Sequence, residues 1–77
     1  MSATLGKVAA ASVAKVVEIT AVSTRSFEDA IVVGIDRASK TLKNVQGAWV
    51  KEQKVKVKDG KIAQYRVGLM VTFILED

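Results

Sequence analysis

The first clear pattern in the chain is a run of β-branched residues between positions 13 and 22, "VAKVVEITAV", in which only Lys15 and Glu18 carry charge. β-Branched side chains are enriched in strands, so this run predicts a strand. Residues 1 to 12 show no comparable pattern. We expect them to form a loose N-terminal extension ahead of one domain that spans residues 13 to 77.

The next segment, "STRSFEDA", carries the signals of a helix start. Ser26 can accept a hydrogen bond from the backbone amide of Asp29 while the Asp29 carboxylate reaches back, which is a variant of the capping box. From Phe27 to Val45 apolar residues recur at spacings of three and four, which predicts a helix of about eighteen residues with one apolar stripe. Val32 and Val33 lie off this stripe, and we assign them to a subunit contact.

Charged residues support the same helix. Glu28 and Asp29 place negative charge in its first turn, and Lys40 and Lys43 place positive charge in its last turn, as the helix dipole favours. Asp36 precedes Lys40 by four residues, and this order favours an ion pair on the outer surface of the helix.

Two strands joined by a tight turn complete the pattern. Asp59-Gly60 predicts a type I′ turn, in which both central residues have positive φ. The last strand alternates, and we assign one set of its residues to the core face against the helix. That set is Tyr65, Val67, Leu69, Val71, Phe73 and Leu75. In the strand before the turn, Trp49, Gln53, Val55 and Val57 share one parity, and Lys54, Lys56 and Lys58 share the other.

The resulting fold class is α+β, with β-α-β-β order and a three-stranded antiparallel sheet. One helix covers only one face of such a sheet, so the other face is expected to meet another subunit. A chain of 77 residues without cysteine buries only about 60% of its unfolded surface and has no disulfide to stabilise it. We therefore expect a homo-oligomer.

The composition excludes several chemistries. Without cysteine or histidine, the chain has no thiolate metal site, no Ser–His or Cys–His pair and no imidazole base. There is no glycine-rich phosphate loop either, so we expect no enzymatic activity. The net charge of +4 suits an anionic partner, although surface solubility explains such an excess more often. Nucleic acid is disfavoured as that partner, because the lysine-rich strand lacks exposed aromatics for base stacking.

The opening apolar stretch is too short for a signal peptide, and no run approaches the ~18 residues of a membrane span. We therefore expect a cytoplasmic protein without membrane contact.

Four motifs in order, "KVVEI", "SFEDA", "RASKTLKN" and "DGKIAQY", resemble the dodecin family over residues 13 to 77. The resemblance implies a hollow homododecamer in which each sheet partly wraps its own helix. It also implies non-enzymatic binding and storage of a flavin, FMN or riboflavin.

The family's flavin contacts are changed in this chain. The family's stacking tryptophan stands three residues after the helix-terminal asparagine, and here Asn44 is followed at that spacing by Gly47. The family's glutamine after the hairpin tyrosine is here Arg66. Trp49, two residues beyond Gly47, is expected on the same face. It either stacks a ligand or fills the space at Gly47, and the second interpretation is favoured. Gln53, of the same parity, completes the candidate ligand set.

Arg66 and Glu52 suggest different occupants. Arginine only donates, so Arg66 suits a phosphate better than a flavin ring edge, and a ligand of the phosphorylated flavin or nucleotide type is favoured over riboflavin. Glu52 stands where relatives have an acidic residue near a subunit junction, which makes it the candidate metal ligand, although a lone carboxylate is a poor calcium site unless symmetry adds others. The alternative function is a flavin-free structural or metal-binding cage.

Overall fold

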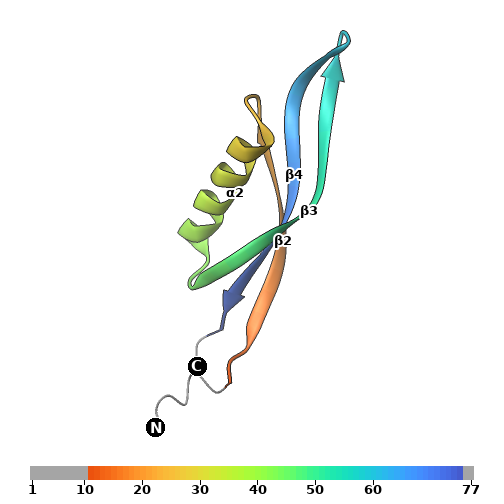
Figure 1. Cartoon of the computed structure of the whole chain (residues 1–77). Coiled ribbons are helices and arrows are strands. Elements are labelled where there is room, and N and C mark those ends of the chain that lie inside the picture. Colours follow the sequence, from red (N-terminus) through yellow and green to blue (C-terminus); the bar gives the residue numbers. More distant parts are fainter. Residues whose placement is uncertain (1–10, 76–77) are drawn as a thin grey trace.

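The computed structural model describes residues 11 to 75, so most of the expected N-terminal extension lies outside the described residues. The chain runs from strand β2 (Ala14–Ser23) through helix α2 (Phe27–Thr41) to strands β3 (Val45–Lys58) and β4 (Lys61–Ile74) (Figure 1). None of the described helices has the length and hydropathy needed to cross a membrane.

The three strands form one antiparallel sheet in the order β2-β4-β3. Helix α2 lies along one face of this sheet, mainly against β2 and β4 (Figure 1). The α+β class and the β-α-β-β order expected from the sequence are confirmed.

The helix start is held by two serines. The Ser26 hydroxyl accepts from the Asp29 amide at 3.0 Å, as expected for the N-cap. The Asp29 carboxylate, however, accepts from the Ser23 hydroxyl at 2.6 Å, and the Ser26 amide donates to Ser23 Oγ at 3.4 Å. The expected return contact from Asp29 to the cap residue is therefore wrong. The buried Ser23 stands between the two groups and connects the end of β2 to the start of α2.

The helix ends earlier than its apolar periodicity predicts. It stops at Thr41, Leu42 is already extended, and Asn44 has a left-handed φ of 60°. Asparagine tolerates this conformation because its short polar side chain costs little there, so the chain turns into β3 before the apolar pattern ends. Lys43 consequently lies beyond the helix. The expected pair between Asp36 and Lys40 forms at 3.3 Å.

The core lies between α2 and the middle of the sheet. Val67, Leu69 and Val71 of β4 are buried, and they face the small helix residues Ala30, Gly34 and Ala38. A Cβ built on Gly34 would lie 2.9 Å from Leu69 Cδ1 and 3.0 Å from Ala21 Cβ, so the glycine is what allows helix and sheet to approach this closely.

The core face assigned to β4 is thus confirmed at its centre. Tyr65 and Phe73 are half-buried, and Tyr65 makes an edge-to-face contact with Phe27, with ring centroids 5.2 Å apart. The assignment of Leu75 to this core face is wrong, because Leu75 lies beyond the end of β4 and remains 46% exposed.

Beyond the core, β3 and β4 continue as a two-stranded hairpin. Strand β2 pairs with β4 only from Tyr65 onward, so residues 56 to 64, here called the hairpin arm, have no third strand. The arm extends past the helix (Figure 1). Asp59 and Gly60 have φ of 53° and 75°, which is the expected left-handed pair at the turn. The radius of gyration, 16.6 Å, exceeds the about 11 to 12 Å of a compact chain of this length.

Candidate functional site

Most candidate residues lie on the outer face of the sheet, which is the face opposite α2. Because Val67, Leu69 and Val71 point toward the helix, the residues between them on β4 point outward. Residues directly opposite each other in an antiparallel pair share a face. The register pairs Gly47 with Thr72, Trp49 with Met70, Glu52 with Gly68 and Lys54 with Arg66. Gly47, Trp49, Glu52 and Arg66 are therefore brought to one face.

A bulge in β3 determines which side chains share this face. Val50 pairs with Leu69 and Glu52 with the adjacent Gly68, so Lys51 is an extra residue without a partner on β4. An extra residue reverses the alternation of side chains on the bulged strand. Trp49 therefore lies on the same face as Lys54, and the expected separation of Trp49 from the lysines is wrong.

The same bulge removes Gln53 from the candidate set. Gln53 pairs with the buried Val67, so it belongs to the helix side of the sheet. The parity that grouped it with Trp49 holds only for a strand without an insertion. Gln53 and the other candidate ligand residues lie on opposite faces.

Trp49 is exposed although it is the largest apolar side chain of the face. Its exposed fraction is 53%, and Met70 lies opposite it on β4, so the expectation that the lysine-rich strand lacks an exposed aromatic is wrong. Apart from Gly47 and its two chain neighbours, no residue of the subunit has an atom within 4 Å of a Cβ built on Gly47. Position 47 is thus open in the subunit, and the indole stands beside it on the same face.

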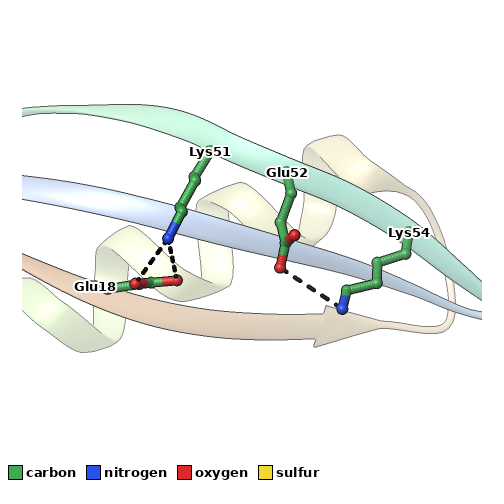
Figure 2. A network of polar contacts seen from close by, with 4 residues as sticks. All are labelled: Glu18, Lys51, Glu52 and Lys54. Carbon is green, nitrogen blue, oxygen red and sulfur yellow. Dashed lines mark hydrogen bonds and ion pairs between the residues drawn. The ribbon is translucent and has the colours of Figure 1, made fainter.

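Two ion pairs lie on this face (Figure 2). Lys51 reaches over β4 to Glu18 on β2, with Nζ 3.3 and 3.4 Å from the two carboxylate oxygens. Lys54 Nζ lies 3.6 Å from Glu52 Oε2. Glu52 lies against β4, since a Cβ on Gly68 would stand 3.1 Å from its Cγ.

These ion pairs affect whether Glu52, the candidate metal ligand, can bind a metal ion. Glu18 and Glu52 each have a lysine ammonium as neighbour, and residues 11 to 75 contain no group of three His, Cys, Asp or Glu side chains that could hold a metal ion. Calcium takes six to eight oxygen ligands, and the lysines already supply positive charge to both carboxylates. The outer face of one subunit does not fit a calcium site.

Three cations surround a hollow at the base of the hairpin arm. Arg66 stands directly opposite Lys54, and Lys56 follows two residues later on β3. Together with Val55 they line a depression of ≈ 290 Å³, here called the cationic hollow. Sequence reasoning placed Arg66 in a ligand site but missed its lysine neighbours. A second irregularity brings Lys54 opposite Arg66: Ala63 is an extra residue on β4 between the pairs Lys56–Gln64 and Val57–Ile62.

A second depression, of ≈ 350 Å³, lies between β2 and α2 and contains none of the candidate residues. Its lining is mainly apolar and includes Val33, which is half exposed, as the expected subunit contact requires. That contact remains a prediction.

Comparisons with known proteins agree with this architecture. The family model described as Dodecin matches residues 13–76. Dodecin from Streptomyces davaonensis is 35% identical, with a TM-score of 0.82, over 86% of this chain and 97% of that chain. A single-site mutant of the Thermus thermophilus dodecin is 34% identical, with a TM-score of 0.82, over 87% of this chain and 100% of that chain.

A third similar structure is that of a calcium-binding dodecin. It is the calcium dodecin of Mycobacterium tuberculosis, a calcium-chelating antigen with a novel calcium-binding site. It is 36% identical, with a TM-score of 0.73, over 84% of this chain and 93% of that chain. The search of curated proteins gave no match.

Proposed function

The chain belongs to the dodecin family of small-ligand-binding proteins, and from this premise we propose that it forms a homododecameric shell that binds a small aromatic ligand of the flavin type without chemically transforming it. The observation that carries the proposal is the half-exposed Trp49 on a sheet face that no element of its own subunit covers. An indole is a flat apolar platform, and it stands beside the open position at Gly47.

Assembly is supported by surface that one subunit cannot bury. Val57 and Ile62 of the hairpin arm are 59% and 52% exposed, and Val32 and Val33 form an apolar patch on the helix. A two-stranded hairpin is marginal in water without further packing. We expect light scattering at micromolar concentration to give a single species of dodecamer mass, and a monomer or dimer would contradict the shell.

The ligand we propose is a phosphorylated flavin or nucleotide. Arg66 only donates hydrogen bonds, so it would leave the N–H of a flavin ring edge unpaired, at a cost of about 1 to 3 kcal/mol when buried. Phosphate oxygens can accept hydrogen bonds from both arms of the guanidinium. Trp49 and Arg66 are separated by the four steps from Met70 to Arg66 on β4, about 13 Å, a length that a ring with a phosphorylated side chain can span.

The alternative is a shell that holds no flavin. It is favoured by the side chain missing at Gly47, because Trp49 would then fill space near a subunit junction instead of stacking a ligand. In this alternative a metal ion, as in the calcium dodecin, would need carboxylates from several subunits, since Glu18 and Glu52 are each paired with a lysine.

Titrating FMN and riboflavin against the fluorescence of Trp49, the sole tryptophan, separates these functions. We expect FMN to quench the indole and bind more tightly than riboflavin. The variant Gly47→Trp/Trp49→Glu/Arg66→Gln restores the family pattern and should bind riboflavin more tightly, with Arg66→Gln alone as its control. Submicromolar binding of riboflavin to the unmodified protein would show that Arg66 does not discriminate. Absence of quenching by both flavins would favour the flavin-free shell.

A further inference from the structure

The cationic hollow needs an explanation of its own, because it places like charges face to face. Lys54 and Arg66 are a direct cross-strand pair, and like charges in that arrangement destabilise a sheet. Lysines on an edge strand discourage unwanted pairing with other chains, which would account for Lys54 and Lys56 on β3. That explanation does not extend to Arg66, because β4 is the central strand.

Few acidic groups neutralise these cations. Within residues 11 to 75, neither Lys56 nor Arg66 has a carboxylate at ion-pair distance. Lys54 has only Glu52, at 3.6 Å, and both side chains are more than half exposed, so this pair is weak. The hollow therefore holds three positive charges against one loosely held negative charge.

The geometry suits one class of anion. A guanidinium binds two oxygens of a phosphate through its fork, and ammonium groups act as mobile point charges around the remaining oxygens. We propose that Lys54, Lys56 and Arg66 form a binding site for a phosphate group, either inorganic or carried by a phosphate ester or diphosphate. The site shares Arg66 with the proposed flavin function, but it requires neither Trp49 nor an aromatic ring.

The same hairpin provides a matched control. Lys58 and Lys61 also face each other across the strands, but they stand next to the turn and do not line the hollow. Replacing either pair of lysines by glutamine removes two charges from the hairpin arm or its base. Only Lys54→Gln/Lys56→Gln removes them from the hollow, and this variant leaves Arg66 intact.

The test measures calorimetric binding and thermal unfolding of the full chain with pyrophosphate, ADP or riboflavin, each against sodium chloride at equal ionic strength. We expect pyrophosphate and ADP to bind and raise the Tm above the chloride control, and riboflavin, which has no phosphate, to leave this site unoccupied. The variant Lys54→Gln/Lys56→Gln should weaken phosphate binding by about tenfold or more, whereas Lys58→Gln/Lys61→Gln should retain it within about threefold. Circular dichroism checks that both variants fold, and single Lys56→Gln replaces the double variant if it does not.

Two outcomes would overturn the site. An equal rise in Tm with chloride, or an equal loss of phosphate binding in Lys58→Gln/Lys61→Gln, would mean that the arm acts only through its overall charge.

The two phosphate probes distinguish the ligand of the site. ADP binding much more tightly than pyrophosphate would identify a phosphorylated organic ligand, and equal binding would identify the inorganic ion. Binding of pyrophosphate without quenching of Trp49 by any flavin would leave this site standing while the proposed flavin function fails.

Discussion

Strands β3 and β4 pass through two different environments, and the contrast shows what makes a strand residue part of a core. Near α2, the alternating residues Val67, Leu69 and Val71 are buried. In the hairpin arm, Val57 and Ile62 belong to the same two strands and are more than half exposed. These five side chains are all apolar, although the arm as a whole is richer in lysine. The covering helix makes the difference, because burial requires a second layer.

The contrast also locates the surface that is left for partners. Helix α2 covers β2 and β4 and barely reaches β3. The arm and the outer face keep apolar and cationic side chains that the subunit itself does not need for its core. Core residues should therefore affect the free energy of unfolding most, while residues of the arm and the outer face should affect assembly and ligand binding.

The strongest test of this contrast uses one apolar residue from each region. Leu69→Ala removes a side chain that is 1% exposed, and we expect the free energy of unfolding to fall by about 2 to 5 kcal/mol. Ile62→Ala is the comparison in the arm, where the side chain is 52% exposed in the subunit; we expect it to weaken assembly in light scattering and to lower the free energy of unfolding less than Leu69→Ala does. Urea unfolding at one fixed protein concentration measures both. A near-neutral Leu69→Ala would mean that the faces of β4 are assigned the wrong way round.

Two glycines test the covered face against the outer face. Gly34→Val places atoms where Leu69 and Ala21 already lie, and we expect a loss of about 1 to 3 kcal/mol. Gly47→Val adds the same side chain to a strand position with no atom within 4 Å, so little change in stability is expected. Thermal unfolding of both variants checks the difference. Equal losses would argue against close helix–sheet contact at Gly34.

The smallest changes in the free energy of unfolding are expected from two helix variants, one at the capped start of the helix and one on its exposed outer surface. Ser26→Ala removes the acceptor for the Asp29 amide, and we expect a loss of about 1 kcal/mol. Asp36→Asn breaks the exposed pair with Lys40 and should cost no more than about 0.5 kcal/mol. Urea midpoints rank the two variants, and an Asp36→Asn effect as large as that of Ser26→Ala would contradict the ranking.

Local signals in the sequence predicted much of the fold. Asp59-Gly60 marked the turn because few residues accept two successive positive φ angles. Ser26 marked the helix start because a hydroxyl can satisfy a free backbone amide there. The motifs shared with dodecins identified the family. The end of the helix was harder to predict, since Leu42 and Val45 continue the apolar spacing although Asn44 has already turned the chain.

Neighbouring residues and simple alternation were enough to predict the order of the elements, the turn, Ser26 as the N-cap and the centre of the buried face of β4. The composition of the outer face, in contrast, follows from how the strands pair. The extra residue Lys51 reverses the alternation of β3, which places Trp49 beside Glu52 and Lys54 and turns Gln53 toward the helix side. A bulge forms from the register between two strands, so it depends on how β3 pairs with β4, and the pattern of β3 alone does not contain it.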